Sequence, residues 1–152
     1  MTKRVVAIVL KIPDNAAYTA LTALRRSGLN VERVERSEVW QLEDSGSPAT
    51  LAERVRANAT IFNPNKHRLE VLERESPRLG ETWIDEIGDH DEVREHLGGT
   101  TIAGVSRARR SIGWRLRGPG GKPVTRETLV EAVEKLLCNP AIEKARYHDT
   151  SS

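Results

Sequence analysis

The densest run of residues able to do chemistry is a stretch of arginines beginning at residue 107. Four arginines recur at odd positions, a lysine follows, and no acidic residue interrupts the run: Arg107, Arg109, Arg115, Arg117 and Lys122. Planar guanidinium groups bind carboxylates and phosphates through paired hydrogen bonds. Because side chains alternate between the two faces of a strand, the four arginines would share one face. One hypothesis is that this stretch docks a partner protein.

Other roles stay open for the same stretch. It can be a solvated sheet face, or it can meet the acidic residues that gather between residues 81 and 95. A phosphate or nucleic-acid site is a further role, although few aromatic side chains are present on which bases could stack. The opposite face would be mostly apolar, interrupted by Arg110, with Ala108, Ile112, Trp114 and Leu116.

Two short motifs near this stretch resemble catalytic loops only superficially. Gly118-Pro-Gly-Gly-Lys122 lacks the spacing of a phosphate-binding loop, and Pro123 stands where a serine or threonine would hold magnesium. We expect a hairpin or linker loop there. Gly104-Val-Ser-Arg-Ala108 does not form a nucleophile elbow, because it lies inside a predicted strand.

The remaining reactive side chains form no catalytic or metal-binding set. The histidines, at positions 67, 90, 96 and 148, are never spaced as ligands on one helix turn. We expect His90 and His96 to lie on an acidic surface helix over residues 89–97. The one cysteine, Cys138, has no paired base and fits a small apolar position at a helix end. We therefore expect no catalytic residues, no metal and no cofactor.

Composition predicts a globular protein rather than a disordered or membrane-spanning one. The 152 residues are 38% hydrophobic and 30% charged, with 24 basic and 22 acidic residues giving a net charge of +2. The longest apolar run, residues 5–10, is too short to span a bilayer and is predicted to be a strand, not a signal peptide. A cytoplasmic location is expected.

The elements that must position these residues alternate between strands and helices. Proline, glycine and capping signals delimit the helices: one from Asp14 to Gly28, one from Ser47 to before Asn63-Pro64, and one beginning at Thr125. The predicted strands are residues 3–12, 31–42, 67–72, 82–87, 101–117 and 141–147. This order is typical of a split βαβ or ferredoxin-like unit.

The chain resembles itself at an offset of 74 residues. Between residues 31–42 and 105–116 six of twelve aligned positions are identical: Val31/Val105, Arg33/Arg107, Arg36/Arg110, Ser37/Ser111, Trp40/Trp114 and Leu42/Leu116. Asn63-Pro64 and Asn139-Pro140 then follow related helices. We predict an α+β fold of two ferredoxin-like repeats, residues 1–76 and 77–152, whose antiparallel sheets are covered by helices and which pack as a pseudo-dimer. Trp40 and Trp114 would be equivalent core positions.

The repeated pattern resembles a known family. A strand Val-x-x-Val-x-x-Ser-x-x-Trp-x-Leu is followed by a closing segment, Val133-Glu-Lys-Leu-Leu-Cys-Asn-Pro-Ala-Ile-Glu143. Together these resemble the PurS-type small subunit of phosphoribosylformylglycinamidine (FGAM) synthase, here apparently duplicated in tandem. In that family a large subunit performs an ATP-dependent amidation in purine biosynthesis, a glutaminase subunit supplies ammonia, and the small subunit bridges the two.

The resemblance implies a non-catalytic assembly subunit with the large synthase subunit and the glutaminase subunit as partners. Further homo-oligomerisation is left open, and a membrane partner is not expected. The alternatives are a regulatory module that binds a small molecule between duplicated units and a nucleic-acid-binding protein that uses residues 107–117. A free-standing enzyme has the least support.

Overall fold

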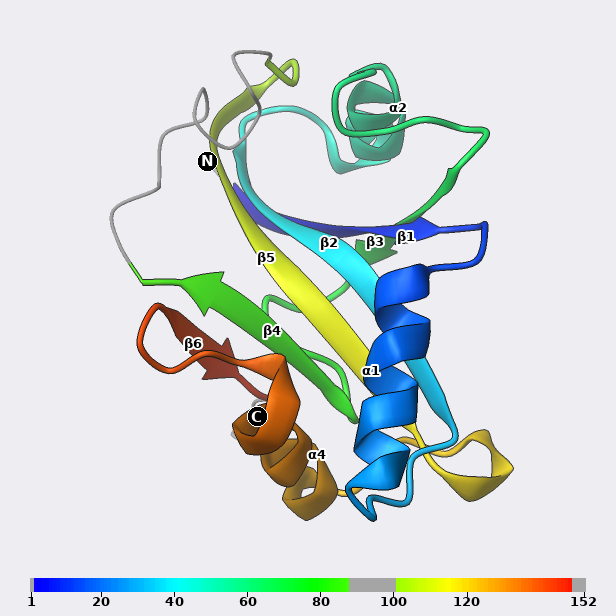
Figure 1. The fold of residues 1–152 in the computed structure, drawn as a ribbon. Coiled ribbons are helices and arrows are strands. Elements are labelled where there is room, and N and C mark those ends of the chain that lie inside the picture. Colours follow the sequence, from blue (N-terminus) through cyan, green and yellow to red (C-terminus); the bar gives the residue numbers. More distant parts are fainter. Residues whose placement is uncertain (1, 88–100, 149–152) are drawn as a thin grey trace. The chain divides into compact units, whose positions relative to one another are not determined.

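The chain folds as an α+β protein built on one antiparallel sheet, which confirms the predicted class. In the computed structural model, which describes residues 2–87 and 101–148, six strands follow the order β3-β1-β2-β5-β4-β6 (Figure 1). The strands are β1 (Thr2–Leu10), β2 (Arg33–Asp44), β3 (His67–Leu72), β4 (Glu81–Glu86), β5 (Val105–Arg117) and β6 (Glu143–Arg146). The α-helices of the described part are α1 (Asn15–Arg26), α2 (Leu51–Arg56) and α4 (Arg126–Ala132). None of the described helices is both long and apolar enough to cross a lipid bilayer.

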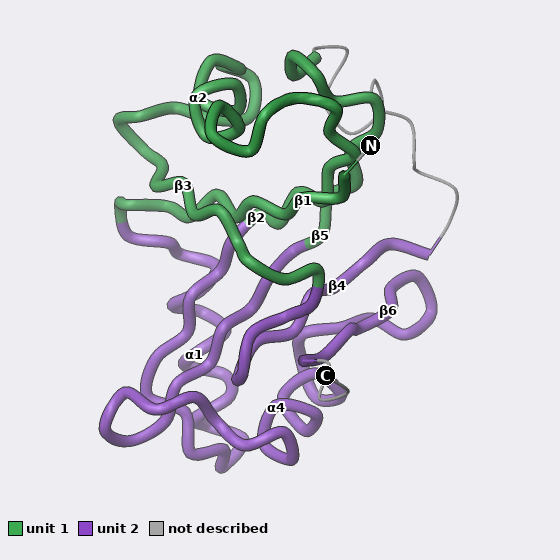
Figure 2. Tube along the Cα trace, turned by 180° about the vertical axis from the view of Figure 1, so that it is seen from behind, with its two compact units in different colours: residues 1–12, 38–75, 88–111 green, residues 13–37, 76–87, 112–152 purple. Residues whose placement is uncertain are grey.

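The chain divides into two compact units, each assembled from segments far apart in sequence (Figure 2). Unit 1 comprises residues 1–12, 38–75 and 88–111, and unit 2 comprises residues 13–37, 76–87 and 112–152. Strands β2 and β5 each contribute residues to both units. Each unit therefore takes segments from both halves of the chain, and the repeat boundary at residue 76 stays a prediction.

Unit 1 is organised around β1, whose apolar run is buried along its length. Strand β1 pairs with β3 from Val5 opposite Leu72 to Leu10 opposite His67. Helix α2 packs its apolar side chains into a core made of Val6, Ile8, Trp40, Leu42, Leu51, Val55, Ile61, Phe62, Ile102 and Ala108. Burying these side chains supplies the main driving force for folding of the unit.

Unit 2 has a separate core formed by two helices and the strands they cover. Helix α1 begins where the Asp14 carboxylate accepts hydrogen bonds from the N–H groups of Ala16 and Ala17, as the sequence predicts. After helix α1 the chain turns at Gly28, whose φ of 87° favours glycine. The core consists of Ala20, Leu24, Leu29, Val31, Leu116, Leu129, Ala132, Val133 and Leu137, and Trp114 packs against it. Trp40 and Trp114 thus pack against different cores.

The ends of two helices have local causes. Helix α2 ends at Arg56, well before Asn63-Pro64, because the Asn58 side chain accepts a hydrogen bond from the Thr60 N–H and donates one to the Thr101 carbonyl. Such side-chain bonds to the backbone compete with helix continuation. Helix α4, capped by Thr125 as predicted, ends in a π-helical turn over Val133–Leu137. The acidic helix expected over residues 89–97 lies outside the described residues.

Candidate functional site

The five basic residues singled out by the sequence lie on β5 and the loop after it, but in different environments. In unit 1 the side chains of Arg107 and Arg109 are exposed. In unit 2 Arg115 and Arg117 are half-buried, and Lys122 is exposed. Arg107 and Arg109 are therefore exposed to solvent, whereas Arg115 and Arg117 are partly covered by other residues of unit 2.

The predicted alternation along β5 holds at its ends and fails in its middle. Ala108 and Leu116 are buried as expected, but Ser111 and Gly113, on the face expected to display arginines, are also buried. The register explains the failure for Gly113. Trp83 of β4 lies directly opposite it, and residues directly opposite in a sheet share a face. The tryptophan is fully buried, so this part of the arginine face is covered within unit 2.

Within the described part of the chain, Arg107 and Arg109 have no ion-pair or hydrogen-bond partner. Their neighbour Arg110 is paired with Glu38, at 3.8 Å between Nη1 and Oε1 and with both side chains more than 40% exposed. Such an exposed pair contributes little to stability. The first part of β5 therefore presents exposed cationic side chains that the described residues do not neutralise.

Two carboxylates of β4, one at its beginning and one near its end, are buried. Glu81 is 1% exposed and Asp85 is 3% exposed. Arg78 donates to Glu81 from its backbone N, Nε and Nη2 at 2.9, 3.3 and 3.0 Å. Arg146 holds Asp85 through Nε and Nη2 at 2.6 and 3.0 Å and lies 5.1 Å from the centroid of Trp83. Charged groups are buried here because each carboxylate has its own guanidinium.

Arg115 lies beside this arrangement without an ion pair of its own to any described residue. It is directly opposite Glu81 in the register between β4 and β5, yet that carboxylate accepts hydrogen bonds from Arg78. Burial lowers the pKa of the Arg115 guanidinium, the nearby charges of Arg78 and Arg117 lower it further, and Glu81 and Glu35 oppose the shift. The arginine remains charged, since its ordinary pKa is above 12. Its surroundings disfavour that charge.

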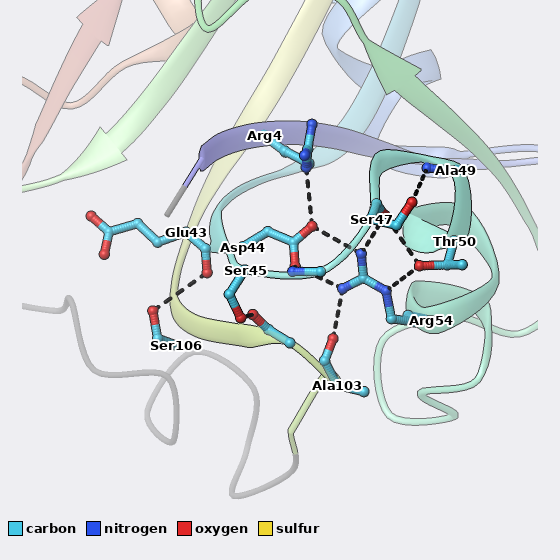
Figure 3. A network of polar contacts seen from close by, with 12 residues as sticks. Arg4, Glu43, Asp44, Ser45, Ser47, Ala49, Thr50, Arg54, Ala103 and Ser106 are labelled. Carbon is cyan, nitrogen blue, oxygen red and sulfur yellow. Dashed lines mark hydrogen bonds and ion pairs between the residues drawn. The ribbon is translucent and has the colours of Figure 1, made fainter.

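A polar network of unit 1 centres on Asp44, the last residue of β2 (Figure 3). The fully buried carboxylate binds Arg54 through both oxygens, at 2.7 and 2.9 Å, and Arg4 at 3.0 Å. Arg54 also donates to the carbonyls of Ala103 and Ser47 and to the Thr50 hydroxyl. Its five N–H donors therefore all have acceptors.

This network is built to hold structure and not to transfer protons. The Arg54 side chain, above all, lowers the pKa of Asp44 from 3.8 to about 2, with smaller contributions from the Gly46 N–H and Arg4, against the opposing effect of burial. The carboxylate is therefore a very weak base at neutral pH. The network links the three segments of unit 1, through Arg4 in the first, Asp44 and Arg54 in the second, and Ala103 in the third.

The two Asn-Pro motifs form turns before a strand, as predicted, and the turns use the same hydrogen bonds. In the first, the N–H of Asn63 donates to Nδ1 of His67, and the Asn63 side chain accepts from Asn65. In the second, the N–H of Asn139 donates to Oε1 of Glu143, and its side chain accepts from Ala141. Both asparagine carbonyls also accept from the third and fourth residues that follow. The two Asn-Pro motifs thus form turns with the same pattern of hydrogen bonds.

The other reactive groups contribute no further site. Cys138 is half-buried, and burial with the nearby Glu143 charge raises the pKa of its thiol, which disfavours the nucleophilic thiolate. Among residues 2–87 and 101–148, no three histidine, cysteine or acidic side chains gather as metal ligands. The glycine-rich loop forms a tight turn over Pro119–Gly121 in which the Gly118 N–H donates to the Lys122 carbonyl. His90 and His96 lie outside the described residues.

Comparison with known proteins does not assign this arrangement to a family. No model of a protein family matches the chain, and no protein of curated function resembles it at a significant level. The fold and the side chains described above are therefore the basis for a functional hypothesis.

Proposed function

We propose that this chain is a non-catalytic assembly subunit of FGAM synthase, made of two PurS-like ferredoxin-type repeats in tandem. It would bridge the ATP-dependent synthase subunit and the glutaminase subunit so that ammonia passes between them. The observation that supports this most directly is the pair of isostructural turns at Asn63 and Asn139. Both belong to the motif on which the family resemblance rests.

The repeat hypothesis has further support in the order and burial of the elements. Strand, helix, strand, helix and strand follow one another from β1 to β3, and β4, β5, α4 and β6 follow in the corresponding order. Aligned residues of β2 and β5 share their burial: Ser37 with Ser111, and Leu42 with Leu116. A buried serine at the same place in two strands is unusual enough to favour a common origin.

Docking would rely on exposed cations of unit 1. Arg107 and Arg109 are exposed and have no ion-pair partner among residues 2–87 and 101–148, so an acidic surface of a large subunit could bind them without breaking an ion pair within that part of the chain. Opposite charges across an interface accelerate association and fix its register. Arg115, Arg117 and Lys122 would extend the docking residues in unit 2.

Reconstitution with the separate synthase and glutaminase subunits tests this proposal. We expect the three to co-sediment at low salt with glutamine and Mg-ADP present, and glutamine-dependent FGAM formation to require this chain. Changing Arg107 and Arg109 together to glutamate should weaken the complex about tenfold or more. Arg56→Glu, which reverses the charge of another exposed arginine of unit 1, is the matched control. No association with the synthase subunit at low salt would refute the proposal.

A regulatory module that binds a small molecule is the second candidate. The half-buried Arg115, which has neighbouring like charges and no ion pair of its own among the described residues, favours it. If reconstitution fails, this candidate becomes the leading one.

A further inference from the structure

The beginning of β4 pairs with the end of β5 in unit 2 (Figure 1), and there the charges of Arg78 and Arg117 both act on Arg115. We propose that Arg115, Arg117 and Arg78 form a binding site for the phosphate group of a small molecule. This site does not depend on the synthase assignment, because every residue it uses belongs to the fold of unit 2.

The register shows why Arg115 is available to a ligand. In an antiparallel pair, an arginine directly opposite a glutamate ordinarily forms a cross-strand ion pair. Here Glu81 lies opposite Arg115, but it accepts three hydrogen bonds from Arg78, which comes from the segment preceding β4. The carboxylate is 1% exposed and held in place. Arg115 is thus half-buried while its natural partner is engaged elsewhere.

The local charge balance favours an anion. Two like charges, Arg78 and Arg117, and two carboxylates, Glu81 and Glu35, act on Arg115. Each of the two cations affects Arg115 more than either carboxylate does. Lys122, in the loop after β5, is a further exposed cation. A dianionic phosphate would match these cations better than a single carboxylate.

Arg117 is held by a weak contact, and the loop after it is open around its glycines. The described hydrogen bond of the Arg117 side chain is a long one, 3.5 Å from Nη1 to the Gly121 carbonyl. Gly120 and Gly121 have positive φ, and a Cβ added at either position would meet nothing within 4 Å. Arg117 could therefore exchange a weak backbone contact for a charge-assisted one, which is roughly twice as strong as a neutral hydrogen bond.

Partial burial makes these arginines suited to a small ligand. Arg115 and Arg117 are half-buried, whereas Arg107 and Arg109 of unit 1 are exposed. Arginine binds phosphate oxygens bidentately, so two arginines suffice to fix the orientation of one phosphate group.

Binding of inorganic phosphate and of pyrophosphate, followed by calorimetry and thermal unfolding at low ionic strength, tests the site. We expect saturable binding and a rise in the unfolding midpoint that chloride at the same ionic strength does not produce. Arg115→Met should weaken pyrophosphate binding by at least about tenfold. In the absence of phosphate it should unfold at the same or a higher temperature than the wild type, because a half-buried, repelled charge is gone.

Two further variants make the outcome decisive. Arg117→Gln, at a position whose side chain makes one long hydrogen bond within the described part of the chain, should also weaken binding while leaving the unfolding midpoint unchanged. Arg109→Met, an exposed arginine of unit 1 on the same strand, should alter neither quantity. Equal losses of binding in Arg109→Met and Arg115→Met would overturn the proposal, because they would indicate non-specific electrostatic attraction of the phosphate to the positively charged protein. A lower unfolding midpoint for Arg115→Met without phosphate would overturn it too.

Discussion

Replacing Asp44 by asparagine would remove the anion at the centre of the unit 1 network while keeping the size of the side chain. The asparagine could not neutralise Arg54, whose side chain is only 15% exposed and donates to both carboxylate oxygens. Breaking a buried ion pair by removing one partner leaves the other charge buried and uncompensated, which costs roughly 3–5 kcal/mol. We therefore expect Asp44→Asn to lower the free energy of unfolding by about 3 kcal/mol at neutral pH.

The pKa of Asp44 gives an independent estimate and a pH signature. Lowering this pKa from 3.8 to about 2 on folding corresponds to about 2 kcal/mol of stabilisation. Because the folded-state pKa is the lower one, this stabilisation is fully present above the unfolded value of 3.8. It is lost as the pH falls through about 2. About 1 kcal/mol should already be gone at pH 3.

Urea unfolding of the wild type and Asp44→Asn between pH 7 and pH 3 measures both quantities. The difference in unfolding free energy should narrow by about 1 kcal/mol over this range. Glu38→Gln is the matched control, since it removes a carboxylate of the same unit from an exposed pair with Arg110. It should change stability by less than about 1 kcal/mol at either pH. A difference between wild type and Asp44→Asn that is equal at pH 7 and pH 3 would refute the reasoning.

Three smaller perturbations, each followed by urea unfolding, test individual turns and caps. Gly104→Ala should destabilise by about 1–2 kcal/mol or more, since the glycine has a φ of +82° and a Cβ there would lie 2.9 Å from Nη1 of Arg54; wild-type stability would contradict this. His67→Ala should cost about 1 kcal/mol because the Asn63 N–H loses its acceptor, whereas His67→Glu should stay within about 0.5 kcal/mol, since glutamate serves in the second turn. Equal losses in both would disprove the equivalence of the turns. Asp14→Ala should cost about 1 kcal/mol with reduced helicity, and an unchanged circular dichroism spectrum and stability would show that the cap is dispensable.

Local signals in the sequence were sufficient where the structure depends on local chemistry. Asp14 and Thr125 cap their helices, and Gly28 adopts the positive φ expected after a helix end. Each signal acts through hydrogen bonds or backbone sterics within a few residues, so composition and spacing alone reveal it. The strand positions followed from similarly local alternation and proline boundaries.

The burial of charges could not be predicted because it depends on residues distant in sequence. Glu81 and Asp85 belong to an acidic block that is typical of a solvated surface, yet both are buried. The partner of Asp85 is Arg146, 61 residues later, and nothing in the spacing pairs the two. One local signal did point to this burial. Glu81, Trp83 and Asp85 are two residues apart, so they share one face of a strand, and a tryptophan is typical of a buried face.

The candidate site was predictable in part for the same reason. The exposure of Arg107 and Arg109 fits the predicted arginine face of β5. The separate environment of Arg115 required the strand register and knowledge that Arg78 binds Glu81. The Asp44 network was missed because its members, among them Arg4 and Arg54, come from three separated segments.

The interleaved make-up of the two compact units has a consequence for biosynthesis. The core of unit 1 includes Ile102 and Ala108, and the core of unit 2 joins Ala20 and Leu24 to Leu137. During translation, therefore, neither core can close when the first half of the chain has left the ribosome. Folding must wait for contacts between residues about a hundred positions apart, which slows it and leaves apolar strands exposed in the meantime. Apolar residues of both cores therefore stay exposed to solvent until the second half of the chain has been synthesised.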